Sequence, residues 1–203
     1  RNINDPKLEK LKRKIEKKMM PNSQYFVRLS STSGKNEKAI KPFTNANDIL
    51  QHITSVTQFV IQEYNRDKDT YLIMITWQDK IDPRCEFRIF VVDGRLTAAS
   101  PQRYWELHQY SQEELDAFEY ALTNIKFIDR VPYRTFVADV YIDTDTQTCH
   151  LIELNPFGAS SGAGASFFNW KTDYDLLYEI KQEKPELRYL SIIDYYTYSG
   201  IHL

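Results

Sequence analysis

The chain has 203 residues, of which 42% are apolar and 27% are charged, and its formal net charge is −2. This profile is typical of a globular protein with one large domain or two small lobes, and it predicts no general attraction to nucleic acid or to an anionic membrane. No apolar run reaches the roughly 20 residues that span a bilayer. Cys85 and Cys149 are predicted to be free thiols of a cytoplasmic protein.

The chain begins with a predicted basic helix over residues 7–20. Four apolar residues recur there at helical spacing, namely Leu8, Leu11, Ile15 and Met19. Seven of the residues from 7 to 18 are basic. This pattern indicates a solvated helix docked by its apolar stripe, with a face that binds a partner or nucleic acid as the alternative.

A strand, a loop, a helix and a second strand are expected next. Residues 24–31 predict a strand, and residues 31–38 (STSGKNEK) form a polar Ser/Gly loop able to close over phosphates. A helix with an asparagine cap is expected from Asn47 onward, with its apolar stripe at Ile49, Ile53, Val56 and Val60. The continuous apolar run over residues 71–77 predicts a strand buried on both faces.

Further elements follow in the second half of the chain. Asp93-Gly94 predicts the turn of a hairpin over residues 85–100, and Ser111 with Glu114 forms a capping box for a helix over residues 111–125. The later elements expected are strands 136–143 and 149–155, a glycine-rich loop 158–166, a helix around 173–182 and a strand near 188–192. This irregular mixture predicts the α+β class.

Two carboxylates meet in the predicted hairpin 136–155. If its turn is centred near Thr146, Asp139 faces Glu153, and strand alternation places Asn155 on the same face. The opposite face is predicted to be core, with Phe136, Ala138, Val140, Ile142, Ile152 and Leu154. Facing carboxylates repel unless a cation lies between them. The three oxygen-bearing side chains therefore suit Mg²⁺, and a solvated sheet surface is the alternative.

Cations that could meet nucleotide phosphates occur in several of these segments. They are Arg28, Lys35, Arg88 and Arg103. Neither glycine-rich segment has the spacing of a Walker A or a dinucleotide-binding motif, so the P-loop and Rossmann folds are excluded.

Six motifs occur in a characteristic order, namely FVRLSSTSGKNE, a Trp after an apolar strand, EFRIFVVDGRL, SPQRYW, FVADVYID and LIELNPFG. Over roughly residues 25–170 this order resembles the cell division cycle protein 123 family of the ATP-grasp superfamily. The resemblance implies two α+β lobes with antiparallel sheets that sandwich ATP and Mg²⁺. Residues 1–76 would form the lobe with the basic helix and the phosphate loop, and residues 77–203 the lobe with the metal-binding hairpin.

The resemblance also implies roles for individual residues. The metal ligands would be Asp139, Glu153 and Asn155. Phosphates would be contacted by Arg28, Lys35, Arg88 and Arg103. The strand that ends at Trp77 would offer its backbone to adenine, chiefly at Ile73, Met74 and Ile75.

Two functions are compatible with this resemblance. The first is that of the family, an ATP-dependent assembly factor that binds the gamma subunit of translation initiation factor 2. The alternative is an ATP-dependent carboxylate–amine ligase or a related phosphotransfer enzyme, in which Arg88 and Lys35 stabilise the transferring phosphoryl group. The chain departs from the family pattern at Glu153, where an Asp is expected, and at Arg28, where a Lys is expected. These departures predict a divergent member.

Overall fold

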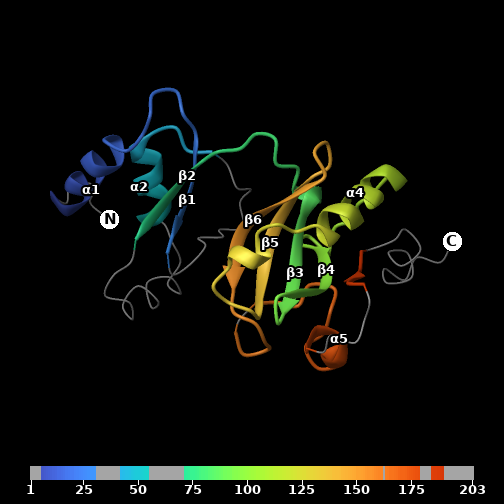
Figure 1. Cartoon of the computed structure of the whole chain (residues 1–203). Coiled ribbons are helices and arrows are strands. Elements are labelled where there is room, and N and C mark those ends of the chain that lie inside the picture. The colour runs from blue at the N-terminus through green and yellow to red at the C-terminus, as the bar shows by residue number, and fades with distance from the viewer. Residues whose placement is uncertain (1–5, 31–41, 55–70, 162, 179–183, 190–203) are drawn as a thin grey trace, which may run out of the picture. The chain divides into compact units, whose positions relative to one another are not determined.

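The computed structural model describes residues 6–30, 42–54, 71–161, 163–178 and 184–189 (Figure 1). The chain divides into two compact units, Arg1–Asp79 and Lys80–Leu203. No helix in the described ranges is long and apolar enough to cross a membrane.

The first unit packs two helices against a two-stranded sheet. Its elements are α1 (Pro6–Glu16), β1 (Tyr25–Leu29), α2 (Ala46–Thr54) and β2 (Leu72–Thr76). The strands pair antiparallel, with Val27 opposite Met74. Ile15 of α1 and Ile49 of α2 are buried in a common core with Val27. The predicted helix 7–20 is thus confirmed, although α1 ends at Glu16.

Local side-chain chemistry sets the start of α2. Asn45 Oδ1 accepts a hydrogen bond from the backbone N–H of Asp48 at 2.9 Å, so Asn45 caps the helix and α2 starts before the predicted Asn47. Ile49 and Ile53 of the predicted stripe pack into the core of this unit. Val56 and Val60 lie outside the described residues.

The prediction that the strand over residues 71–77 is buried on both faces is wrong. Leu72 and Met74 pack against the core of the first unit, whereas Ile73 is 36% exposed and Ile75 is 50% exposed. The reason is that α1 and α2 supply the core on only one face of the sheet. The apolar run is therefore a half-covered strand.

The second unit contains a five-stranded sheet in the order β6-β5-β3-β4-β7. Its strands are β3 (Glu86–Val92), β4 (Arg95–Pro101), β5 (Phe136–Asp143), β6 (Thr148–Asn155) and β7 (Glu186–Leu187). The first four pair antiparallel, and β7 runs parallel to β4. A final strand is predicted near residues 188–192. The strand observed there, β7, lies slightly earlier, at Glu186–Leu187.

Two local signals in this unit are confirmed. Asp93 and Gly94 have φ values of 50° and 77°, the left-handed conformations that a tight turn between β3 and β4 requires. The helix α4 (Gln112–Thr123) begins with the predicted capping box, in which Ser111 and Glu114 each bond the backbone N–H of the other.

The sheet is covered on both faces (Figure 1). Residues of α4, with Phe118 at their centre, pack on the face that carries Phe87 and Ile89. On the other face Phe90 and Val137 are covered by apolar residues of segment 157–178, which includes α5 (Tyr174–Tyr178). Two 3₁₀ turns, η1 (Pro83–Cys85) and η2 (Ile128–Arg130), complete the described elements of this unit.

A β-bulge corrects one predicted core residue. Asp139 pairs with Glu153 and the next residue, Val140, pairs with Leu151, so Ile152 is an extra residue on β6. Ile152 is 47% exposed and does not belong to the core, contrary to the prediction. Strict alternation fails here because the extra residue reverses which residues of β6 face the core.

Candidate functional site

The candidate site is a row of polar residues across the sheet of the second unit. Arg88 on β3 lies opposite Asp139 on β5, which lies opposite Glu153 on β6. The predicted pairing of Asp139 with Glu153 is thereby confirmed. On the other side of β3, Arg88 lies opposite Ser100 of β4. Four strands thus bring one side chain each to the same row.

A buried ion pair joins the two central members of this row. Arg88 Nε donates to Asp139 Oδ1 at 2.8 Å, and Arg88 Nη2 donates to Asp139 Oδ2 at 2.9 Å. The two side chains are only 12% and 11% exposed. This two-bond geometry supplies the positive charge that facing carboxylates need, because Arg88 neutralises Asp139 beside Glu153.

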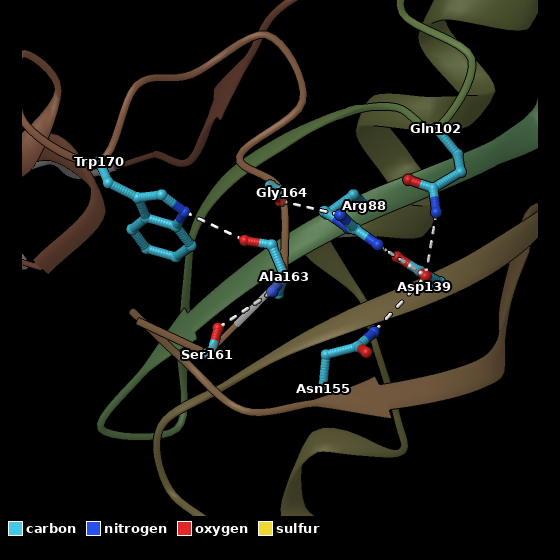
Figure 2. A network of polar contacts seen from close by, with 8 residues as sticks. All are labelled: Arg88, Gln102, Asp139, Asn155, Ser161, Ala163, Gly164 and Trp170. Atoms are coloured by element: carbon cyan, nitrogen blue, oxygen red, sulfur yellow. Dashed lines mark hydrogen bonds and ion pairs between the residues drawn. The ribbon is translucent and has the colours of Figure 1, made fainter. Parts of the chain in front are cut away.

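Two amide side chains complete the contacts of Asp139 (Figure 2). Gln102 Nε2 donates to Asp139 Oδ2 at 3.0 Å, and Asn155 Nδ2 makes a longer contact of 3.5 Å with the same oxygen. Among the described residues, Oδ2 therefore has three contacts and Oδ1 has one. Since a carboxylate offers about four lone-pair sites, Oδ1 can still accept a further contact.

The glycine-rich loop is attached to this network at Arg88. Arg88 Nη1 donates to the carbonyl oxygen of Gly164 at 2.8 Å, and Trp170 Nε1 donates to the carbonyl oxygen of Ala163 at 3.1 Å. Within the loop, Ser161 Oγ bonds the carbonyl oxygen of Gly158 and the N–H of Ala163. Figure 2 shows the loop backbone passing directly beside the guanidinium. The loop thereby holds Arg88 in place from the side opposite Asp139.

The donor set fits a hard divalent cation. Asp139, Glu153 and Asn155 bring two carboxylates and an amide to one patch of the sheet, and Mg²⁺ prefers such oxygen ligands. Glu153 is half-buried beside the bulge of β6. No cluster of three His, Cys, Asp or Glu side chains that could hold a metal occurs within the described ranges. A metal held by Asp139, Glu153 and Asn155 would have three protein ligands, and phosphate oxygens and water would complete its shell.

The predicted residues of the second unit divide into two groups. Arg88, Asp139 and Asn155 form one contact network, and Glu153 lies in register beside it. Arg103 does not join this network, because its Nη1 pairs with Glu106 Oε1 at 3.2 Å on the surface.

Three residues at the site were not predicted from the sequence. Gln102 and Gly164 belong to the contact network, and Ser100 lies in the same row of the sheet. Gln102 lies in the SPQRYW motif directly before the predicted Arg103, so the motif already indicated this segment. Ser100 is fully buried, and its hydroxyl has no hydrogen-bond partner in the part of the chain that the structure describes.

The remaining predicted residues belong to the first unit. Arg28 is partly buried on β1 opposite Ile73, and its Nε donates to the carbonyl oxygen of Leu29 at 3.4 Å. Trp77 follows β2 and is partly buried. Lys35 and the polar loop 31–38 lie outside the described residues.

The backbone pairing of β2 identifies which residues could contact adenine through main-chain groups. Just beyond the ends of the two strands, Tyr71 accepts a hydrogen bond from Ser30 and Trp77 donates one to Gln24, each at 2.8 Å. Backbone groups alternate between the two edges of a strand, so those of Ile73 and Ile75 also face β1. The N–H and C=O of Met74 point to the opposite edge, where no strand pairs within the described residues. Of the three predicted residues, only Met74 has backbone groups directed to that edge.

Comparison with known proteins identifies the family. A family model described as D123 matches residues 39–197. The chain belongs to the D123 family. Among curated D123 relatives, it is 32% identical over 100 residues to the translation initiation factor eIF2 assembly protein of Vanderwaltozyma polyspora. It is 30% identical over 119 residues to cell division cycle protein 123 of Eremothecium gossypii.

The two alignments cover 48% and 58% of this chain but only 27% and 32% of those relatives. The chain thus matches about a quarter to a third of the length of these D123 proteins.

A solved structure confirms the α+β fold. The C-terminally truncated Cdc123 from Schizosaccharomyces pombe superimposes with a TM-score of 0.71 at 20% sequence identity. The superposition covers 90% of this chain and 79% of that one. A second structure of Cdc123 from the same organism gives a TM-score of 0.67 at 19% identity.

Proposed function

We propose that this D123 protein binds ATP and Mg²⁺ as an ATP-grasp module, with the polar row of the second unit as its metal and phosphate site. The observation that carries the proposal is the buried arginine held beside two carboxylates and an amide on one sheet face. A buried ion pair seldom adds stability over apolar residues of the same size. Its presence beside the apolar residues Phe90 and Val137 on the same sheet face therefore supports a binding role.

Each residue of the row has a distinct part in the proposed site. Asp139, Glu153 and Asn155 supply oxygen ligands, and bound Mg²⁺ would neutralise phosphate charge. Arg88 is held at one end by Asp139 and at the other by Gly164, so its guanidinium is oriented before a phosphate arrives. Such preorganisation lowers the entropy that binding costs.

For the first unit, the resemblance implies contacts with the base and with the phosphates. Met74 offers backbone groups at the edge of β2 that no described strand pairs, and the exposed side chains of Ile73 and Ile75 offer an apolar surface for a base. Arg28 and Lys35 would add positive charge for the phosphates. By the same resemblance, Trp77 ends the strand that would meet the base, and Arg103 of the second unit would add a further cation for the phosphates.

The proposed cellular role follows the names of the relatives. We infer that the chain acts in the assembly of eIF2 through its gamma subunit in the cytoplasm, because two D123 relatives are named eIF2 assembly proteins. A pulldown with purified eIF2 subunits in the presence of ATP and Mg²⁺ tests this role. Recovery of gamma alone among the separate subunits is expected, and failure with every subunit would contradict it.

Titration calorimetry with ATP and MgCl₂ tests the site itself. Glu153→Gln removes a ligand charge without touching the Arg88–Asp139 pair, so we expect Mg²⁺-dependent ATP affinity to fall at least about tenfold, or about 1.4 kcal/mol. Asp145→Asn is the matched control, since Asp145 is exposed in the turn of the same hairpin. Equal affinities for both variants and the parent chain would refute the metal assignment.

The same protein distinguishes the assembly factor from the ligase. Release of ADP or AMP that rises when carboxylate and amine acceptors are added would support the ligase. Binding of ATP without turnover would support the assembly role. In either case the effect of Glu153→Gln reports on the metal site.

A further inference from the structure

A continuous basic stripe runs along α1. Lys10, Arg13, Lys14 and Lys17 follow the spacing i, i+3, i+4 and i+7. The first three lie on one side of α1, and Lys17 follows directly after the helix, where its N–H still bonds the carbonyl oxygen of Arg13 at 3.2 Å. All four are exposed. Between residues 7 and 18 there are seven basic and two acidic residues, a net charge of +5 in a chain whose net charge is −2. The charge of the whole chain therefore conceals a strongly positive segment.

The opposite side of α1 fixes this stripe in place. Ile15 is 3% exposed, and Leu8, Leu11 and Met19 pack against the same core. Because its apolar side is already used inside the first unit, α1 cannot insert that side into a membrane. The stripe is thus a rigidly presented surface.

The stripe is not explained by the stability of the helix. Lys10 with Lys14, and Arg13 with Lys17, are like-charge pairs one turn apart, each of which costs about 0.2–0.5 kcal/mol. None of the four has an acidic partner among the described residues, whereas the neighbouring Lys12 contacts Glu16 at 4.0 Å. A polyanion that contacted the stripe would remove this repulsion.

The composition of the surface favours nucleic acid over a protein partner. Protein interfaces depend on buried aromatic or aliphatic anchors. No large apolar side chain within α1 is exposed; the nearest, Met20, lies beyond its end. Contact with a phosphate backbone needs only appropriately spaced cations. We propose that the α1 stripe, defined as Lys10, Arg13, Lys14 and Lys17, binds the phosphate backbone of nucleic acid without reading its sequence.

Fluorescence anisotropy with a fluorescein-labelled 20-base-pair RNA duplex in 50–200 mM NaCl tests the proposal. The stripe variant changes its four residues to Gln, which preserves helix propensity. The control variant changes Lys80, Lys126, Arg130 and Lys171 to Gln. These four are also exposed and remove the same charge from the second unit.

The salt dependence is the decisive measurement. Each lost phosphate contact lowers the slope of log K against log salt by about 0.9. We therefore expect the stripe variant to lose about 3.6 units of slope and at least about tenfold in affinity at 100 mM NaCl. The control variant should remain within about threefold of the parent chain. Equal losses in both variants, or no loss in the stripe variant, would overturn the proposal.

Two further arms exclude other polyanions and misfolding. The stripe variant is also tested with vesicles containing phosphatidylserine and with a polyglutamate peptide, and loss of either ligand with unchanged RNA affinity would overturn the proposal. Circular dichroism verifies folding. The milder variant Lys10→Gln/Lys14→Gln should lose about half as much slope as the stripe variant, because it removes two of the four contacts. ATP affinity should be unchanged in all variants, so the test is independent of the proposed ATP site.

Discussion

The two faces of the five-stranded sheet are made from alternate residues of the same strands, yet different forces hold them. On the α4 face, Phe87 and Ile89 are buried in an apolar core around Phe118. On the opposite face, Phe90 is covered by apolar residues, but its neighbour Arg88 is held by Asp139 and the glycine-rich loop. One face is therefore built for stability, whereas the other gives up stability for a charged site.

The largest expected effect is on the α4 face. Phe118 is 1% exposed, and its ring centroid lies 4.8 Å from that of Phe87. Phe118→Ala should lower the free energy of unfolding by about 3–5 kcal/mol, because it leaves a cavity in a packed core. Urea denaturation followed by circular dichroism measures this change. Tyr120→Ala on the exposed side of the same helix should cost about 0.5 kcal/mol or less. Similar losses for the two variants would contradict the assignment of α4 as the stabilising layer.

On the opposite face, the next largest effect is expected when the pairing of Arg88 with Asp139 is broken. Arg88→Met leaves the carboxylate of Asp139 buried without its cation and should cost about 3 kcal/mol. The double variant Arg88→Met/Asp139→Leu should recover most of this loss while abolishing ATP binding. Denaturation and calorimetry on the same samples separate the two effects. A double variant no more stable than Arg88→Met would show that the pair itself stabilises the fold.

A smaller effect is expected at the start of α4. Ser111 Oγ accepts the N–H of Glu114 at 3.2 Å, so Ser111→Ala should cost about 1 kcal/mol. Ser111→Asp preserves a capping oxygen and should be nearly neutral. The melting temperatures of the two variants provide the measurement. A loss for Ser111→Asp equal to that for Ser111→Ala would exclude capping as the cause.

The smallest effect is expected at Ser100, one of two buried hydroxyl residues on β4. The buried Ser100 hydroxyl has no partner among the described residues, so Ser100→Ala should change stability by less than about 0.5 kcal/mol or increase it. Thr97 Oγ1 instead donates to the carbonyl oxygen of Phe90 at 3.2 Å, so Thr97→Val should cost about 1 kcal/mol. Chemical denaturation compares them. A larger loss at Ser100 would mean that its hydroxyl makes a stabilising contact.

Local patterns in the sequence determined much of the second unit. The Asp93-Gly94 turn, the Ser111 cap and the pairing of Asp139 with Glu153 were all predicted, because each depends on residues close in the chain. Helical spacing likewise located the docked side of α1. The order of the family motifs indicated the α+β fold that the solved relatives share.

The assembly of the site depends on contacts between segments that are distant in the sequence, which are visible only in the tertiary structure. The contact of Arg88 with Asp139 joins residues 51 apart and depends on β3 lying beside β5, which no local pattern states. The bonds from Gln102 and to Gly164 arise in the same way. The exposure of Ile75 likewise depends on which face of a sheet the rest of the chain covers. Short-range stereochemistry therefore specifies turns, caps and periodicity, whereas the pairing of distant strands selects the partners of each charged side chain.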